Sequence, residues 1–228
     1  DLYAEDSYAY LPEMVKKNPD LEKLIDRSVR CVLRTKFILG LFDNPYVEIE
    51  EVKKGVRTES SLELAKEADL ESIILLKNEK NTLPLNKSKS TKIALLGPLL
   101  KENTKAMFES VSGSNIIYVD EKGFNLTDQK KGVPNLLEKD PEAIARMVAI
   151  AKGSDLSILF LGGDEHTSKE AYFNNALGDR ATIEPVGPQD ELLEKIKALG
   201  KPVIVVLKHR RTLSINTISE KADAILDT

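Results

Sequence analysis

The stretch Leu156-Ser157-Ile158-Leu159-Phe160-Leu161, which ends in Gly162-Gly163, decides how this sequence folds. A short and nearly continuous apolar run bounded by glycines is typical of a strand that is buried on both faces of a sheet. The run Pro202-Val203-Ile204-Val205-Val206-Leu207 has the same character. Strands of this kind occur in parallel sheets that helices cover on both sides. These two stretches therefore predict the centre of an α/β protein.

Helical and strand-like patterns alternate around these runs. Apolar residues recur at helical spacing among charged residues over 61–72, 141–152 and 189–199, and Gly200 is placed to end the last of these helices. Shorter apolar runs predict further strands over residues 73–78, 92–98, 115–119 and 222–228. This alternation predicts a doubly wound α/β sandwich with a mostly parallel sheet.

The residues before this sandwich follow a different pattern. After Pro19-Asp20, apolar residues at helical spacing over 21–33 predict one amphipathic helix that needs a surface to cover. The pattern breaks near Gly40, and a charged stretch with few large hydrophobic residues follows. We therefore expect the terminal helices of another domain over 1–46, a linker over 47–60 and the sandwich over 61–228. The last strand is followed by no turn, so we expect the rest of the sandwich to lie beyond this chain.

Composition excludes several classes of function. The 228 residues are 41% hydrophobic and 31% charged, with a formal net charge of −4 spread along the chain, so we expect no nucleic-acid partner. No apolar run approaches the roughly 20 residues that cross a bilayer, so we expect no membrane partner, and the first residues lack a signal-peptide pattern. The lone Cys31 lies beside Val32 and Leu33, so we expect it to be buried as a small hydrophobic residue.

The most informative segment for function is the polar loop that runs from Asp164 to Arg180, directly after the strand at 156–161. Connections between strands and helices usually have about 2 to 6 residues, and much longer ones in compact domains are usually functional or disordered. In open α/β sheets, ligands bind outside the carboxyl ends of the strands. We therefore expect this loop to contribute to a functional site at the sheet edge.

Several motifs, in order along the chain, resemble glycoside hydrolase family 3. They are residues 25–46 with Gly40-Leu41-Phe42-Asp43-Asn44-Pro45-Tyr46, Ser72 to Asn78 with Leu83-Pro84-Leu85, Ile93 to Pro98, the loop at 164–180, and Gly200 to Leu207. The first motif resembles the end of the family's catalytic (β/α)8-type barrel, and the others resemble its second, α/β sandwich domain. The resemblance is weakest over residues 101–140.

The resemblance implies a retaining glycosidase that hydrolyses terminal non-reducing β-glucosides or β-xylosides. Such enzymes need a carboxylate nucleophile and a carboxylic acid about 5 to 5.5 Å apart. In the family, the nucleophile is an aspartate on the barrel, which is outside this chain, and the acid/base is a glutamate on a loop of the sandwich. This chain would therefore be inactive without the barrel, which is its expected partner together with a β-linked glycoside substrate. Family members are often periplasmic or secreted.

The family pattern places the acid/base glutamate after a small or basic pair and before a glycine-aspartate-arginine element. Glu170, which follows Ser168-Lys169 and precedes Gly178-Asp179-Arg180, fits this pattern. Glu165 is the alternative because the family often has a glutamate directly after the strand's glycine. From the residues alone, a solvated loop carboxylate is the plainer reading of either glutamate, and the resemblance reverses this for Glu170.

Other residues of the loop have more than one reading. Asp179 and Arg180 either hold the loop through hydrogen bonds or contact the sugar. His166 either binds substrate or is incidental, and Tyr172 with Phe173 forms either a platform for a sugar ring or an anchor to the core. Ser168, Lys169 and, after the strand at 202–207, Arg211 complete the residues that we expect to bind substrate or to position the loop.

The sequence departs from the family pattern after that strand, where Arg210 replaces a glycine and Thr212 a proline, and again at Pro185-Val186-Gly187-Pro188-Gln189. These changes lie near the sheet edge that would face the barrel. The scattered positions 31, 166 and 209 give no zinc-ligand spacing, and no phosphate loop is present, so we expect no metal and no cofactor. The competing reading of the whole chain is a non-catalytic α/β binding or interaction module.

Overall fold

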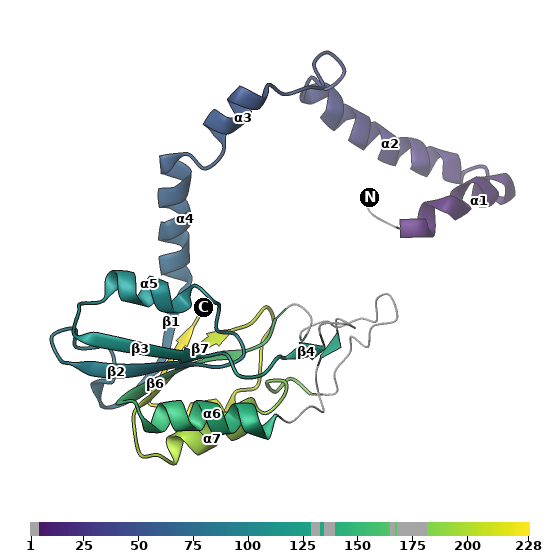
Figure 1. The fold of residues 1–228 in the computed structure, drawn as a ribbon. Coiled ribbons are helices and arrows are strands. Elements are labelled where there is room, and N and C mark those ends of the chain that lie inside the picture. The colour runs from purple at the N-terminus through teal and green to yellow at the C-terminus, as the bar shows by residue number, and fades with distance from the viewer. Residues whose placement is uncertain (1–4, 129–132, 135–139, 165–166, 168–181) are drawn as a thin grey trace. The chain divides into compact units, whose positions relative to one another are not determined.

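A computed structural model describes residues 5–128, 133–134, 140–164, 167 and 182–228 (Figure 1). The chain divides into two compact units, Asp1–Lys66 and Glu67–Thr228. The first unit contains the 3-10 helix η1 (Glu5–Tyr10) and the helices α1 (Leu11–Lys17), α2 (Leu21–Ile38) and α3 (Ile49–Gly55). Helix α4 (Glu59–Ser72) crosses the boundary between the units.

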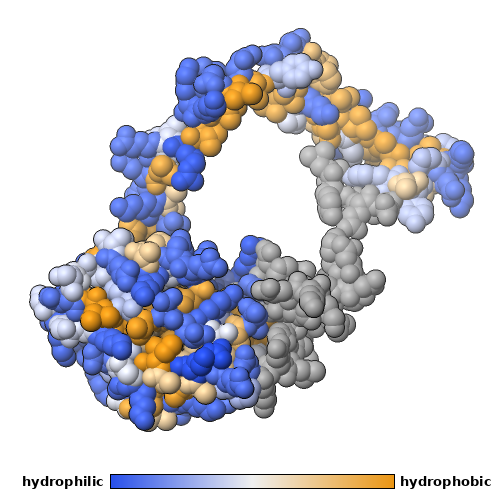
Figure 2. All heavy atoms as spheres, in the orientation of Figure 1, coloured by the Kyte–Doolittle hydropathy of each residue, from blue (hydrophilic) through white to orange (hydrophobic). Residues whose placement is uncertain are grey.

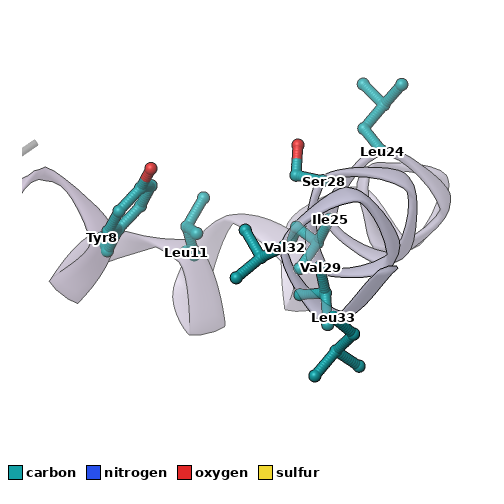
Figure 3. A pocket seen from close by; sticks show the side chains of 8 residues that line it. All are labelled: Tyr8, Leu11, Leu24, Ile25, Ser28, Val29, Val32 and Leu33. Carbon is teal, nitrogen blue, oxygen red and sulfur yellow. The ribbon is translucent and has the colours of Figure 1, made fainter. Parts of the chain in front are cut away.

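The predicted amphipathic helix is present as α2, and its apolar face forms one side of a groove of about 470 Å³ with Tyr8 and Leu11. Figure 3 shows Val32 on the side of α2 that faces Leu11. Apolar side chains such as Phe37 and Ile38 remain exposed at the end of the helix, and apolar atoms run along this unit in Figure 2. Helix α2 thus covers little of its apolar surface within the described residues of its own unit.

The prediction that Cys31 is buried is wrong, because this residue is exposed. The groove-lining residues Ile25, Val29 and Val32 recur three or four positions apart and share one face of α2. Cys31 lies about a third of a turn away from that face, so its apolar sequence neighbours do not bury it.

The second unit is a sandwich built on one sheet. Its described strands are β1 (Ile74–Asn78), β2 (Thr91–Leu96), β3 (Ile116–Glu121), β6 (Leu156–Gly162), β7 (Val203–Lys208) and β8 (Ala224–Asp227). Within the part of the chain that the structure describes, these strands form a sheet of order β1-β8-β7-β6-β2-β3, in which β1 alone is antiparallel to its neighbour. Strands β4 (Thr127–Asp128) and β5 (Val133–Pro134) form a separate small pair. The predicted, mostly parallel sheet is confirmed.

Helices cover both faces of this sheet (Figure 1). The remaining elements are η2 (Glu79–Asn81), α5 (Thr104–Val111), α6 (Pro141–Lys152), α7 (Gln189–Lys197) and α8 (Asn216–Lys221). On one face, α6, α7 and α8 pack Met147, Leu193 and Ile218 against alternate strand residues such as Leu159 and Val205. On the other face, Phe108 of α5 packs against the opposite set, which includes Ile158, Phe160 and Ile204.

The central strands are continuous apolar runs because side chains that point to either face of the sheet are buried. Successive side chains of a strand point to opposite faces, and here each face has its own apolar layer. All of β6 is buried, as the sequence predicts for this stretch. The doubly wound α/β sandwich is thereby confirmed in its layers as well as in its strands.

Candidate functional site

The direction of the strand order reverses at β2, which pairs with β3 on one side and with β6 on the other. The connection from β2 to β3 passes through α5 on one face, while the later connections pass through helices on the opposite face. In doubly wound sheets, such a reversal opens a crevice at the carboxyl ends of the strands, where ligands bind. The segments that leave β2, β6 and β7 therefore meet at the expected place for a site.

A cleft of about 700 Å³ occupies this edge of the sheet. Its lining comes from segments far apart in the sequence: Pro98 to Lys101 after β2, Lys122 after β3, Gly163 and Asp164 after β6, and Lys208 to Arg210 at the end of β7. Burial lowers the pKa of Lys208, and repulsion from Lys101 lowers it further. The described lining has four basic residues, Lys101, Lys122, Lys208 and Arg210, and one carboxylate, Asp164, so the cleft is cationic.

The exit of β6 into the cleft is fixed by the buried side chain of Gln189, at the start of α7. Its Oε1 accepts a hydrogen bond of 2.8 Å from the Gly162 amide, and its Nε2 donates to the carbonyl of Gly162 at 2.8 Å. The same Nε2 also donates to the carbonyl of Val186 at 2.8 Å. Because Gln189 is fully buried, these bonds hold together the two ends of the long segment between β6 and α7.

Two described residues at the start of the predicted loop, Asp164 and Thr167, are hydrogen-bonded to each other. The Thr167 amide donates to the Asp164 carboxylate at 3.0 Å, and the Asp164 amide donates to Thr167 Oγ1 at 2.8 Å. Thr167 is buried, and its hydroxyl also donates to the Asp164 carbonyl at 3.1 Å. Asp164 and Thr167 thus hold each other in place beside the cleft, which Asp164 lines.

On the β7 side of the cleft, His209 interacts with the end of β8. Its Nε2 lies 2.9 Å from Asp227 Oδ1, and both side chains are partly buried. This contact orients the segment that carries Arg210. Arg211 is exposed, and its neighbour Arg210 lines the cleft.

Most of the predicted site residues lie outside the described residues. These are Glu165, His166, Ser168, Lys169, Glu170, Tyr172, Asp179 and Arg180, together with Phe173. Among the residues that are described, no group of three or more His, Cys, Asp or Glu side chains could hold a metal ion. A search of the same residues for a helix long and apolar enough to cross a membrane found none.

The sequence predictions missed Lys101, Lys208 and Gln189. Their positions in the sequence give some indication of a role. Lys101 and Lys208 lie after or at the carboxyl ends of strands, and Gln189 begins a helix after the long loop. Lysines at strand ends are common, however, and only the strand order shows that these two lie in one cleft. A glutamine at a helix start gives no sign in the sequence that it is buried.

A doubly wound sandwich with a cleft at its reversal point defines this chain as an α/β domain of the kind that contributes to ligand sites. Residues 73–228 match the family described as "Glycosyl hydrolase family 3 C-terminal domain". The chain therefore belongs to glycosyl hydrolase family 3, and the resemblance seen in its motifs is confirmed.

Known relatives extend beyond the matched region. The chain is 81% identical over its full length to a Formosa agariphila protein named "Putative beta-xylosidase", of which it covers 30%. It is 31% identical to a Salmonella typhimurium protein named "Periplasmic beta-glucosidase", with 100% of this chain and 33% of that protein aligned. A solved structure of a β-glucosidase from Erythrobacter marinus has a TM-score of 0.77 and 32% identity, over 96% of this chain and 33% of that one. The chain thus spans about a third of the length of these relatives.

Proposed function

We propose that the complete protein hydrolyses terminal non-reducing β-D-glycosidic bonds of β-glucosides or β-xylosides by a retaining mechanism with two carboxylates. The observation that carries this proposal is the membership in glycosyl hydrolase family 3, together with relatives named as β-xylosidase and β-glucosidase. The position of Asp164 supports it, since this residue, hydrogen-bonded to Thr167, lines the cleft at the carboxyl edge of the sheet.

In this proposal, Glu170 is the acid/base, with Glu165 as the alternative. It protonates the oxygen of the leaving group and later activates the water that releases the sugar. The nucleophile is an aspartate of the barrel, outside this chain, and residues 1–46 are the terminal helices of that barrel. The apolar groove on α2 supports this assignment, because such a face packs against another part of a protein.

The remaining predicted residues serve substrate binding or loop positioning. These are His166, Ser168, Lys169, Tyr172, Asp179, Arg180 and Arg211. The barrel of the same protein and a β-linked glycoside are the proposed partners. A periplasmic or secreted location is part of the proposal, and the relative named as a periplasmic β-glucosidase supports it.

Glu170→Gln in the complete protein tests the assignment of the acid/base. We expect kcat/KM to fall about a hundredfold or more for alkyl glycosides, whose leaving groups need protonation, and much less for activated aryl glycosides. Steady-state kinetics on both substrate classes measures the difference. Glu165→Gln is the matched control, with losses that do not depend on the leaving group.

Each outcome separates the alternatives. The same leaving-group dependence in Glu165→Gln instead of Glu170→Gln transfers the role to Glu165. Equal losses on both substrate classes in Glu170→Gln remove that residue from acid/base catalysis. A complete protein that hydrolyses neither class refutes the glycosidase proposal and favours a binding module.

A further inference from the structure

The cleft at the carboxyl edge of the sheet gathers like charges from separate strands. Lys101 follows β2, Lys122 follows β3, Lys208 ends β7, and Arg210 lies two residues farther on. Within the described residues, the structure shows no ion pair for the three lysines. Among the described residues that line the cleft, Asp164 is the one with an acidic side chain. The carboxylate of Asp227, at the end of β8, lies 2.9 Å from His209 Nε2.

This arrangement is unfavourable for the isolated protein. Burial and repulsion from Lys101 both disfavour the charged form of Lys208, which is why its pKa is lowered. Acidic residues on neighbouring strand β3 do not compensate, since Asp120 lies 3.5 Å from Lys105 and Glu121 lies 3.7 Å from Arg146. A bound anion would relieve the repulsion among the cationic groups.

The position of the cleft beside the loop after β6 indicates which part of the substrate would carry the anionic group. Gly163 and Asp164, the root of the loop that leaves β6, are part of its wall. Under the proposed function, this loop acts on the leaving-group side of the scissile bond, so neighbouring groups of the sandwich would contact the same side of the substrate. Arg210 adds a further positive charge to the lining of the cleft.

We infer that the cleft lined by Lys101, Lys122, Lys208 and Arg210 recognises a carboxylate or sulfate ester on the leaving-group sugar of the substrate. This inference rests on the proposed glycosidase function. The substrates of the complete protein are then acidic oligosaccharides. The enzyme releases a neutral glucose or xylose from a uronic acid or a sulfated sugar. The cations determine the preference for this substrate and take no part in bond cleavage.

The test uses the complete protein and matched disaccharides. Their leaving-group sugar is glucuronic acid, the methyl ester of that acid, or a sulfated glucose. Because a hydrogen bond to a charged group contributes about tenfold or more to binding, we expect kcat/KM for the acid or the sulfate ester to exceed that of the neutral ester about tenfold. The arm with the larger preference identifies the anion, and the preference falls as the salt concentration rises.

The double variant Lys101→Met/Lys208→Met removes two of the four cations and should reduce that preference severalfold, mainly through the KM of the charged substrate. Lys195→Met is the matched control, because this lysine pairs with Glu191 on α7 and does not line the cleft. The control should retain the full preference. Circular dichroism and thermal unfolding check that both variants are folded.

Other results overturn the inference without affecting the proposed function. A complete protein that hydrolyses neutral and charged disaccharides equally well has no anion site of this kind. Equal losses on both substrates in the double variant show that the lysines serve another role, such as contact with the barrel. If no substrate is hydrolysed, calorimetric titration with glucuronic acid and with glucose still decides, because equal binding of the two sugars refutes the anion site.

Discussion

At the scale of single residues, Gly162 is a position where the backbone leaves no room for a side chain. It has a positive φ of +129°, and a Cβ atom there would lie 2.1 Å from the carbonyl oxygen of Lys208 on the neighbouring strand. Both the conformation and the close approach require glycine. This residue therefore sets how β6 ends beside the cleft.

Gly162→Ala should lower the free energy of unfolding by about 3 kcal/mol or more, because the backbone of β6 or β7 must move. Gly200→Ala is the matched control, since Gly200 also has a positive φ, +73°, but has open space around it. The control should lose only about 1 to 2 kcal/mol. Urea unfolding of both variants measures the difference, and equal losses would contradict the steric argument.

At the scale of elements, Asp223 connects the start of β8 to β7 and α7. Its carboxylate accepts a hydrogen bond of 2.8 Å from the Val203 amide and lies 2.5 Å from Lys197 Nζ. Burial by itself would raise the pKa of Asp223, but the hydrogen bonds from Lys197 and Val203 outweigh it, so the pKa is lowered. The side chain of Asp223 is only 10% exposed, so solvent screens this pair weakly.

Helix α7 offers a matched pair of lysines. Lys197→Gln should lower the free energy of unfolding by about 2 kcal/mol, because it removes a charged partner from a nearly buried carboxylate. Lys195→Gln should lower it by less than about 1 kcal/mol, because its partner Glu191 is 40% exposed. Urea unfolding near pH 7 compares the two, and a larger loss for Lys195→Gln would contradict the assignment.

The same pair predicts a dependence on pH. Because the folded pKa of Asp223 is lowered, its stabilising contribution is present above the ordinary value of about 3.9 and is lost as the pH falls through the folded value. The difference in stability between the wild type and Lys197→Gln should therefore shrink below about pH 4. A difference that stays constant down to pH 2 would contradict this linkage.

The sequence predicted long or strongly apolar elements well and short ones poorly. The β6, β7 and α6 stretches were found with nearly correct ends. The two strands are continuous apolar runs, α6 has a helical period, and each has a glycine or proline at a boundary. Helices α5 and α8 were missed because Thr104–Val111 and Asn216–Lys221 are too short to show a period. These helices owe their stability to contacts such as those of Phe108 and Ile218 with the sheet.

The site was harder to predict than the fold for a physical reason. A loop that follows β6 can be recognised locally, and its functional role was expected from its length. The cleft depends on strand order, which brings Lys101 and Lys208 together across more than a hundred residues. No local pattern carries that information, and the predicted burial of Cys31 was wrong for the related reason that burial depends on neighbours distant in sequence.

At the scale of the whole molecule, the chain spans about a third of the length of the relatives described above. The proposed nucleophile belongs to the barrel. We expect the 228-residue chain alone to hydrolyse no aryl β-glucoside or β-xyloside above the buffer rate, because one carboxyl group cannot complete a retaining mechanism. The complete protein assayed at equal concentration is the control. Measurable turnover by the chain alone, abolished by Glu170→Gln, would refute this division of the active site.

The amide of Gln189 gives the sandwich a further property, which concerns how the loop can change through evolution. By bonding to Gly162, it closes the segment between β6 and α7 into a ring whose ends are held inside the core. The entropic contribution to the free energy of closing a loop rises slowly, by roughly 0.6 kcal/mol for each doubling of the loop length. Insertions or deletions within the ring should therefore leave the sheet nearly unaffected, so that loop length can diverge among descendants of one scaffold while the strands stay in register.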